Sequence, residues 1–215
     1  MNPFPMILSS PSGGGKTTIA RMLLERRNDV GYSVSCTTRP PREGEVDGRD
    51  YHFLTMEEFD SLRARGEFAE WARVHGHYYG TLRQEVERVL ASGRHVILAI
   101  DVQGARQLAA RFAEAVLVFL LPPSIQVLLE RLGRRNTESP EELVRRMRNA
   151  REELRAALSY HYVVVNDDLE RTYSVVTSIL EAEEVRHARL PDLSTRVARL
   201  VEELDQRILN LSRSR

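Results

Sequence analysis

The stretch MILSSPSGGGKTTIARMLLERR, from Met6 to Arg27, predicts a strand, a loop and a helix in that order. Met6–Ser9 is a short apolar run, and the glycines that follow it favour a turn. After the turn, apolar residues recur at helical spacing, at Ile19, Met22 and Leu23. Such a strand, loop and helix is the setting in which a glycine-rich loop binds phosphate groups.

The loop matches most of the P-loop pattern, in which a glycine-rich run ends in lysine and a hydroxyl residue. Ser10 stands where that pattern has its first glycine. Consecutive glycines let backbone N–H groups point inward around an anion, and the helix N-terminus adds partial positive charge. We therefore predict nucleoside triphosphate binding here. The expected contacts are Ser10, Pro11, Ser12, Gly13, Gly14, Gly15, Lys16, Thr17 and Thr18.

Lys16 is the only lysine in the chain, since 30 of the 31 Lys and Arg residues are arginine. An ammonium group is a compact point charge on a flexible stem, whereas guanidinium is broader and prefers planar, bidentate partners. We interpret Lys16 as the residue that reaches the outer phosphates and Thr17 as the metal ligand, its hydroxyl facing Mg²⁺. The alternative is a chance lysine in a turn, which the flanking strand and helix disfavour.

The composition indicates one sizeable globular domain. Of the 215 residues, 42% are hydrophobic and 29% charged. The 31 basic and 31 acidic residues leave no net field that would favour nucleic acid or an anionic membrane. We therefore expect neither of those partners, and any affinity for phosphate has to come from local arrangement.

The single cysteine, Cys36, excludes an internal disulfide framework and a multi-cysteine metal cluster. The N-terminal residues MNPFPMILSS have no basic stretch before their apolar run, so they do not indicate a signal peptide. The longest apolar runs, such as Ala115–Leu121, are too short to span a bilayer. We expect a cytoplasmic protein.

Alternating apolar runs and helical patterns predict an α/β fold with a central parallel sheet. Near-continuous apolar runs, typical of strands buried on both faces, occur at His95–Ile100, Ala115–Leu121 and Tyr162–Val165. The expected helices are Thr81–Ala91, Gly104–Phe112, Ser124–Leu132, Pro140–Leu158 and Leu169–Arg189. Two of them have the spacing of a capping box, formed by Thr81 with Gln84 and by Ser139 with Glu142.

Two segments interrupt this alternation within the single domain 1–215. Residues 36–80 are rich in arginine, glycine and aromatic residues and predict an inserted lobe. Residues 133–139 form a polar, basic loop suited to a cover, so residues 126–159 are expected to form a lid. The remaining core consists of residues 4–35, 81–125 and 160–190.

Residues 191–215 are expected to form a last helix after Pro191. It docks on the domain or a neighbour, or it recruits a functional partner, and the sequence leaves these alternatives open. Its apolar stripe consists of Leu193, Val197, Leu200, Leu204, Ile208 and Leu211.

Two stretches, SVSCTTRPPREGEVDGRDYHF from Ser33 and FAEWARVHGHYYGT from Phe68, narrow the choice among P-loop proteins. Here the sequence closely resembles the guanylate kinase family, whose members transfer a phosphoryl group from ATP to GMP. The resemblance runs from about Met6 to about Arg189. It implies a three-layer fold of the P-loop NTPase type with an inserted GMP-binding lobe and a helical lid.

Arg39 and Arg42 lie three residues apart in a loop that contains proline and glycine. Together they offer two guanidinium forks to one phosphate monoester. The resemblance implies that Tyr51 and Tyr79 add phenolic donors to the same phosphate of GMP. The competing interpretations are solvated surface charge for the arginines and core packing for the tyrosines.

Base selection requires a different group. Guanine presents N1–H and its N2 amino group on one edge, so one carboxylate accepts from both, whereas adenine has a bare N1 lone pair there. The resemblance implies that Glu70 reads this edge and that Ser35 and Thr81 contact the base. Asp101 follows a buried strand, at the sheet edge where ligands bind, and it contacts guanine or a metal-bound water. The family often has a second acid where this chain has Ala99.

Phosphoryl transfer requires mainly positioning and neutralisation of charge. The segment ERLGRRNTESPEELVRRM resembles the family's lid, and that match makes Arg131, Arg135 and Arg146 catalytic together with Lys16. Asn166, in a VNDD segment that the family shares, is expected near the adenine of ATP. A helix N-cap is an equally good interpretation of that segment.

Two other functions compete with an ATP:GMP phosphotransferase. Guanylate-kinase-like domains of scaffolding proteins bind peptides without catalysis, which predicts a damaged P-loop and missing acceptor arginines. Kinases of the same fold that act on a phosphorylated sugar should lack the guanine-reading residues. This chain has Lys16, Arg39, Arg42, Glu70 and Thr81. We therefore expect an enzyme with ATP and GMP as partners and Mg²⁺ as cofactor, and a homodimer is among the possible assemblies.

Overall fold

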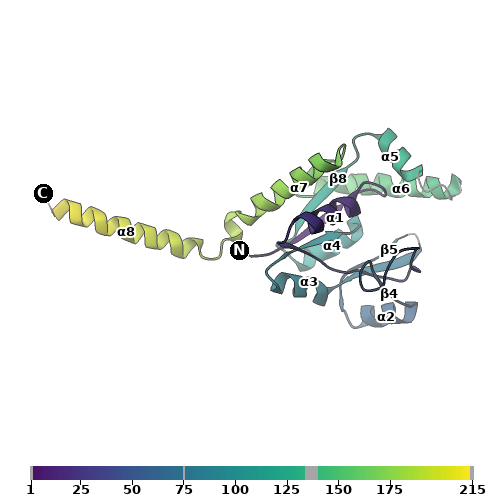
Figure 1. Ribbon diagram of the computed structural model, residues 1–215, viewed down its shortest axis with the longest axis horizontal. Coiled ribbons are helices and arrows are strands. Elements are labelled where there is room, and N and C mark those ends of the chain that lie inside the picture. Colours follow the sequence, from purple (N-terminus) through teal and green to yellow (C-terminus); the bar gives the residue numbers. More distant parts are fainter. Residues whose placement is uncertain (1, 75, 134–139, 214–215) are drawn as a thin grey trace.

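The computed structural model describes residues 2–74, 76–133 and 140–213. Its centre is a parallel sheet of five strands (Figure 1). These strands are β1 (Pro5–Ser9), β2 (Val30–Tyr32), β7 (His95–Ala99), β8 (Val116–Leu121) and β9 (Tyr162–Val165). They lie in the order β2-β7-β1-β8-β9, so the strand before the P-loop occupies the middle. The predicted α/β fold with a central parallel sheet is confirmed.

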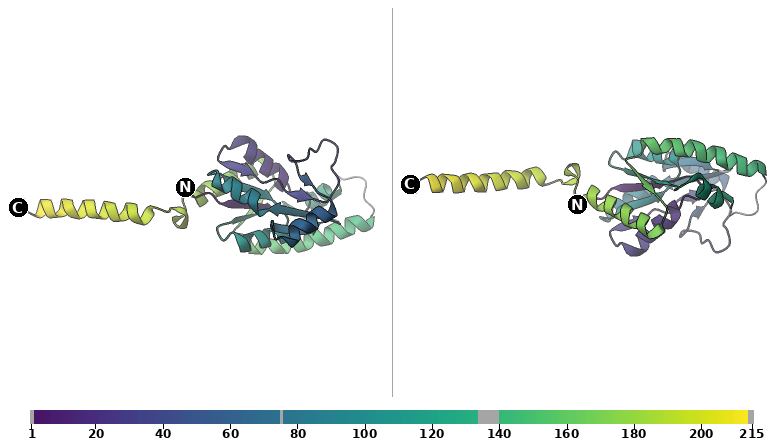
Figure 2. Two further views of the ribbon diagram at one scale, coloured as in Figure 1. Left: turned by 90° about the horizontal axis from the view of Figure 1, so that it is seen from below. Right: turned by 90° about the horizontal axis from the view of Figure 1, so that it is seen from above.

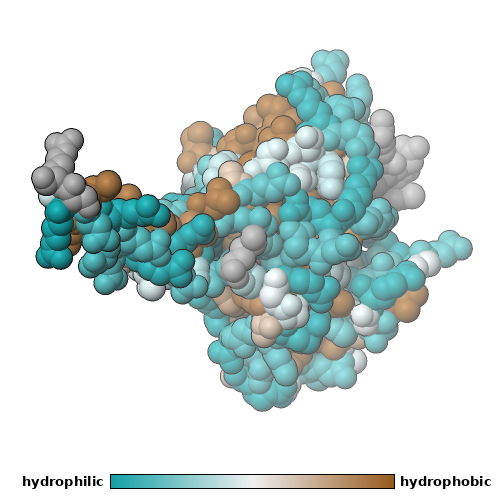
Figure 3. Space-filling model, turned by 60° about the vertical axis from the view of Figure 1, so that its left-hand side comes forward, coloured by the Kyte–Doolittle hydropathy of each residue, from teal (hydrophilic) through white to brown (hydrophobic). Residues whose placement is uncertain are grey.

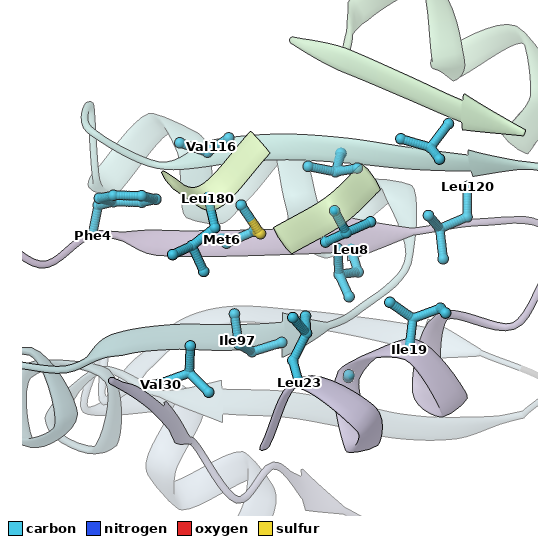
Figure 4. Close-up of a cluster of buried hydrophobic side chains, with 14 residues drawn as sticks. Phe4, Met6, Leu8, Ile19, Leu23, Val30, Ile97, Val116, Leu120 and Leu180 are labelled. Carbon is cyan, nitrogen blue, oxygen red and sulfur yellow. The ribbon is translucent and has the colours of Figure 1, made fainter. Parts of the chain in front are cut away.

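Helices cover both faces of this sheet and give it three layers. The helices that do so are α1 (Lys16–Arg26), α3 (Arg83–Ala91), α4 (Val102–Arg111) and α7 (Leu169–Glu184). Successive side chains of a strand point to opposite faces. Met6 and Leu8 accordingly pack toward α1 and α7 (Figure 4), whereas Ile7 packs toward α3 and α4. The strand that leads into the P-loop is therefore fixed from both sides.

Residues 36–82 contain a second, smaller sheet with its own core. Its strands are β3 (Cys36–Thr37), β4 (His52–Phe53), β5 (Phe68–Val74) and β6 (His77–Leu82), in the order β4-β3-β6-β5. Helix α2 (Met56–Ala64), which we did not predict, packs on it through Phe59, whose ring stacks on Phe68 at 4.4 Å. Thr55 and Glu58 form a capping box at the start of α2. The T-x-x-E spacing of Thr55 and Glu58 in the sequence could have predicted the start of this helix.

The predicted helix start at Thr81 is wrong. Thr81 belongs to strand β6, and α3 begins at Arg83. The Thr81 hydroxyl donates to Glu70 Oε1 at 2.6 Å instead of capping a helix. A charged acceptor makes a stronger hydrogen bond than a backbone group, so tertiary structure overrides the local spacing. The second predicted capping box includes Ser139, which lies outside the described residues.

Two other helix boundaries differ from prediction. Helix α4 begins at Val102, two residues earlier than expected, because the Asp101 carboxylate accepts from the N–H groups of Gln103 and Gly104. Helix α7 ends at Glu184, and a separate 3-10 turn follows at His187–Arg189. The Arg189 guanidinium is buried against Glu183, which holds this turn against the end of α7.

Helices α5 (Ile125–Gly133) and α6 (Pro140–Ala156) pack on each other through Leu128, Leu132 and Ala150. A 3-10 turn at Ala157–Ser159 leads from α6 toward β9. These helices lie in the segment predicted to form a lid, and α6 runs along the body of the domain (Figure 2).

Helix α8 (Leu193–Arg213) projects away from the rest of the molecule (Figures 1 and 2). None of its described residues is buried, and apolar side chains gather along one side of it (Figure 3). The sequence left docking on the domain or a neighbour open, and of these the structure excludes its own domain for the described residues of α8. Among the described residues, no helix combines the length and apolar character needed to cross a membrane.

Candidate active site

The P-loop, Ser10–Gly15, joins the carboxyl end of β1 to α1. Gly13 and Gly15 have φ angles of 78° and 92°, a region that side chains rarely adopt. A Cβ on Gly14 would lie 2.5 Å from the Cβ of Ser10. The Gly14 N–H donates to the carbonyl of Pro11 at 2.8 Å. The shape of this loop therefore requires all three glycines.

Helix α1 begins directly after this loop without a side-chain cap and without an acidic residue in its first turn. A helix start of this kind favours an anion, because N–H groups and the helix dipole point toward it. Thr17 and Thr18 are exposed in that first turn, and Lys16 is partly buried. The predicted triphosphate-binding residues 10–18 thus lie on one continuous loop and helix start, with Lys16 as the first residue of the helix.

Asn166, which directly follows the edge strand β9, supports the P-loop. Its side chain is buried and donates to the Gly14 carbonyl at 2.8 Å, while its Oδ1 accepts from the Thr172 hydroxyl at 3.0 Å. Both ends of the amide are therefore used within the protein. The predicted helix N-cap belongs to Asp168, which accepts from the N–H of Arg171. The contact of Asn166 with adenine stays a prediction.

Two of the three predicted lid arginines lie against the P-loop. Arg146 is 3% exposed and donates to the carbonyl of Leu132 and to Ser12 Oγ, at 2.9 and 3.1 Å. Arg131 donates through Nη2 to the Asn166 carbonyl at 3.1 Å. Its Nη1 is buried and has no hydrogen-bond partner among the described residues. Arg135 lies outside the described residues.

Sequence reasoning missed Glu153, which also lies at this loop. It follows Arg146 by two turns on the same face of α6, and the Ser12 N–H and the charge of Lys16 both act on its carboxylate. Burial raises the pKa of Glu153, and these two groups oppose the rise. A seven-residue spacing from a predicted lid arginine was the only signal that could have identified it.

The predicted guanine-reading residues are brought together in strands β5 and β6. Glu70 is 5% exposed and accepts from the Thr81 hydroxyl, and the Ser35 hydroxyl lies 3.5 Å from that of Thr81. Burial raises the pKa of Glu70 to about 7. The Thr81 hydroxyl opposes this rise, and the negative charge of Asp101 adds to it. A buried carboxylate with a perturbed pKa in such a position is a candidate recognition group.

Two residues of α4 that we did not predict determine where the Glu70 carboxylate lies. A Cβ on Gly104 would overlap Glu70 Oε2. Gln107, one turn later, accepts from the Trp71 N–H at 3.2 Å and donates to the Trp71 carbonyl at 2.7 Å. Because β5 is an edge strand, this amide replaces a missing neighbouring strand. Helix α4 thus fixes Glu70 between its strand and the core sheet.

Asp101 lies at the N-terminus of the same helix. Its Oδ1 accepts from the N–H groups of Gln103 and Gly104, both at 2.8 Å. The structure therefore gives Asp101 a helix-capping role and brings its charge close enough to act on Glu70. Its predicted contact with guanine or a metal-bound water stays a prediction.

The predicted phosphate-binding residues of the lobe also gather in one place. The Arg39 guanidinium lies 5.6 Å from the ring of Tyr51, and the rings of Tyr51 and Tyr79 are 6.0 Å apart. Glu45, missed in the sequence, accepts from Arg39 Nη2 through both oxygens at 2.9 Å and from the Arg42 N–H at 2.7 Å. The side chain of Arg42 itself is exposed. The Glu45 carboxylate thus binds the side chain of Arg39 and the backbone of Arg42.

Comparison with known proteins assigns this arrangement to a family. A family model described as guanylate kinase matches residues 2–183. The guanylate kinase of Chelativorans sp. is 48% identical, over 92% of this chain and 91% of its own length. That of Symbiobacterium thermophilum is 49% identical, over 86% and 87%. A crystal structure of guanylate kinase from Anaplasma phagocytophilum is 36% identical, with a TM-score of 0.75 over 90% of this chain and 92% of that one. This chain belongs to the guanylate kinase family.

Proposed function

We propose that the chain catalyses phosphoryl transfer from ATP to GMP, giving ADP and GDP. One observation carries the proposal: the P-loop and the Glu70 site lie at the carboxyl ends of neighbouring strands. β1 leads into the P-loop, β7 leads into the Asp101–Gly104 turn against which Glu70 lies, and β1 pairs with β7. Ligands bind at this edge in open α/β sheets. A donor and an acceptor nucleotide would therefore meet there.

On the donor side, the backbone of Gly13–Gly15 and the start of α1 surround the phosphates of ATP, with Ser10, Pro11, Ser12 and Thr18 completing the loop. Lys16 extends toward the outer phosphates and neutralises the charge that develops during transfer. Asn166 keeps the loop in shape through the Gly14 carbonyl. Little covalent chemistry is required of the protein, because the reaction depends on positioning.

The donor chemistry of the loop fits Mg²⁺, which takes oxygen ligands and retains several waters. The Thr17 hydroxyl is exposed in the first turn of α1, beside Lys16, and would hold the ion. When bound with ATP, Mg²⁺ supplies charge neutralisation at the phosphate oxygens. Asp101 is the acid considered for a metal-bound water, but its Oδ1 already accepts from the N–H groups at the start of α4.

On the acceptor side, Arg39, Arg42, Tyr51 and Tyr79 bind the phosphate of GMP. Glu45 keeps the Arg39 guanidinium extended in the protein without GMP. Since a phosphate dianion is a stronger partner for guanidinium than one shared carboxylate, GMP can compete for these donors. Tyr51 lies under the guanidinium and limits its movement.

At the base, ionised Glu70 accepts from guanine N1–H and the N2 amino group, and Ser35 and Thr81 complete the polar pocket. Adenine would face the buried carboxylate with its bare N1 lone pair in place of two donors, which is the kind of mismatch that gives strong discrimination. Arg131, Arg146 and Arg135 act on the transferred group from the lid. Arg131 Nη1, buried beside the P-loop and without a hydrogen-bond partner in residues 2–74, 76–133 and 140–213, supports this role.

The affinity for GMP is expected to rise with pH through the pKa of Glu70, about 7 in the free protein. The protonated acid is uncharged and cannot accept from N1–H and the N2 amino group together, so the dissociation constant of GMP should fall about tenfold between pH ~6 and ~8. Titration calorimetry across this range measures it. The phosphate of GMP also titrates in this window, so the control is Glu70→Gln, which should retain only the phosphate contribution. An equal pH dependence in both proteins would contradict the role of Glu70.

The same pKa predicts how stability depends on pH. The folded-state pKa of Glu70 lies above its ordinary value of ~4.3, so the folded protein binds the proton more tightly. Without nucleotide, this carboxyl group therefore makes the free energy of unfolding decrease as the pH rises from the ordinary pKa of ~4.3 to the folded-state pKa of about 7.

Gly104→Ala should raise the KM for GMP about tenfold and leave the KM for ATP unchanged, because the new methyl group displaces the Glu70 carboxylate. The matched control is Gly133→Ala, since a Cβ on Gly133 meets nothing within 4 Å in the described part of the chain. Steady-state kinetics of the two variants provide the comparison. An unchanged KM for GMP in Gly104→Ala would show that Gly104 does not position Glu70.

Product analysis tests the proposed reaction. With ATP, Mg²⁺ and GMP, the protein should form GDP and ADP in equal amounts, and chelation of the metal should stop both. ADP without GDP would indicate ATP hydrolysis and overturn the proposal. A cytoplasmic location agrees with ATP and GMP as the substrates. The proposed GMP-binding lobe comprises residues 36–80, and the proposed lid comprises residues 126–159.

A further inference from the structure

Thr172 is a buried polar residue that lies outside the predicted site residues. It belongs to the first turn of α7, on the helix face that continues with Val176 and Leu180 of the apolar core. The residue is 1% exposed. A hydroxyl group in such a position needs a hydrogen-bond partner, because burial without one costs free energy. The partner is Asn166, whose Oδ1 accepts from the Thr172 hydroxyl at 3.0 Å.

Every backbone and side-chain polar group of Asn166 is bound within the protein. Its N–H donates to the carbonyl of Leu121 at 2.8 Å, and its carbonyl accepts from Arg131 at 3.1 Å. Its side-chain Nδ2 donates to the carbonyl of Gly14 at 2.8 Å. Because Asn166 is also buried, its amide cannot move without leaving polar groups unpaired.

Thr172 completes the pair of hydrogen bonds that fixes this amide. The amide nitrogen faces an acceptor, the Gly14 carbonyl, and the amide oxygen faces a donor, the Thr172 hydroxyl. Without that hydroxyl, Oδ1 would be buried without this donor, and the amide would gain free energy by turning toward another one. Such a turn would weaken the contact of Nδ2 with Gly14.

The Asn166 amide in turn sets the direction of one peptide group of the P-loop. The Gly14 carbonyl and the Gly15 N–H belong to the same peptide group, and they point in opposite directions when that group is trans. The described residues contain no cis peptide bond. Since Asn166 holds the carbonyl, the Gly15 N–H points away from Asn166. The amide lies directly on this glycine, because a Cβ on Gly15 would overlap Nδ2.

We propose that Thr172 is a positioning residue for the donor nucleotide and acts through Asn166 on the Gly15 N–H. In a P-loop the backbone N–H groups surround the α- and β-phosphates, which ATP and ADP share. The inference rests on the proposed function, because it takes ATP as the ligand of the loop. Arg131 contacts the backbone carbonyl of Asn166 and not its amide, so Thr172 affects nucleotide binding more than the chemical step.

Thr172→Val tests the role, because it keeps the shape of the side chain and removes the hydroxyl. Titration calorimetry should show that ADP with Mg²⁺, and ATP with Mg²⁺ in the absence of GMP, each bind about fivefold more weakly. The contact is the same before and during transfer, so kcat and the KM for GMP should stay within about twofold. An unchanged affinity for ADP would overturn the proposal. Equal weakening of ADP and GMP would show a general structural defect and overturn it as well.

Two matched variants test whether the hydroxyl is the cause. Thr172→Ser keeps the hydroxyl and should bind ADP within about twofold of the parent protein. Thr177→Val makes the same substitution on the same helix, at a buried hydroxyl without a hydrogen-bond partner in residues 2–74, 76–133 and 140–213. Its affinity for ADP should equal that of the parent. The same loss in Thr177→Val as in Thr172→Val would contradict a specific role of Thr172.

Combined substitutions test the path through Asn166. Asn166→Ala should weaken ADP at least as much as Thr172→Val does. In the Asn166→Ala protein, Thr172→Val should then have no further effect, because the group on which it acts is gone. Losses that add would show that Thr172 does not act through Asn166.

Nucleotide binding separates this proposal from the proposed reaction. If the parent protein binds ADP but forms no GDP from ATP and GMP, the proposed reaction fails. The effect of Thr172→Val on ADP affinity then still decides the role of Thr172. A parent protein that binds neither ADP nor ATP would overturn both proposals.

Discussion

Replacing Lys16 by alanine is expected to lower kcat about a thousandfold while the protein stays folded. Lys16 is the first residue of α1 and the cation at the end of the P-loop. Lys16 stabilises the charge that develops on the phosphate oxygens during transfer, so the loss should appear in turnover more than in the KM for ATP. Steady-state ADP formation gives the rate, and far-UV circular dichroism confirms the fold.

The informative control is Lys16→Arg, which keeps the charge and changes its shape. The chain uses arginine at 30 positions and lysine only here. If a compact, extensible charge is what the site requires, Lys16→Arg should also lose most of its activity. Parent-like turnover in Lys16→Ala would contradict the assignment of this loop to phosphate binding.

Replacing Glu70 by glutamine is expected to lower kcat/KM for GMP about a hundredfold or more, with the KM for ATP within about twofold. Glutamine has nearly the same shape, but its amide lacks the charge and presents donors to an edge of guanine that also donates. The lost interactions concern the base only. Steady-state kinetics with each nucleotide varied in turn separate the two effects.

Two comparisons make this test specific. Thr81→Val removes the hydroxyl that donates to Glu70 at 2.6 Å, so it should weaken GMP in the same direction by about tenfold. Glu87→Gln changes an exposed carboxylate on α3 and should have no effect. Equal losses for GMP and ATP in Glu70→Gln would show a general structural defect and contradict base recognition.

The P-loop could be predicted from the sequence because its requirements are local. The strand, three glycines, the lysine and the helix start are adjacent in the chain, and the backbone angles of Gly13 and Gly15 follow from that order. The same holds for the buried strands of the sheet, whose apolar runs reflect burial on both faces.

What the sequence did not predict arises where distant segments meet. Thr81 has the spacing of a helix cap, but Glu70 lies across the strand pair and takes its hydroxyl. Asn166 contacts Gly14, which no local pattern connects with it. Gly104 and Gln107 became relevant only when α4 met β5, and no periodicity indicates that a helix will complete an edge strand.

Helix α8 shows the opposite case. Its apolar stripe was visible in the sequence, but periodicity alone cannot say what covers it. The structure removes the domain itself from the alternatives, because no described residue of α8 is buried.

The most direct test of the proposed reaction is ADP release from ATP and Mg²⁺ with GMP, AMP, CMP, UMP and dTMP offered as separate acceptors. We expect rapid turnover with GMP and a rate with AMP lower by a factor of about a thousand or more, because adenine turns a bare N1 lone pair toward the buried Glu70 in place of two donors. Comparable turnover with AMP would contradict base selection by Glu70. No turnover with any of these nucleotides would show that the P-loop and the Glu70 site do not serve one phosphoryl transfer.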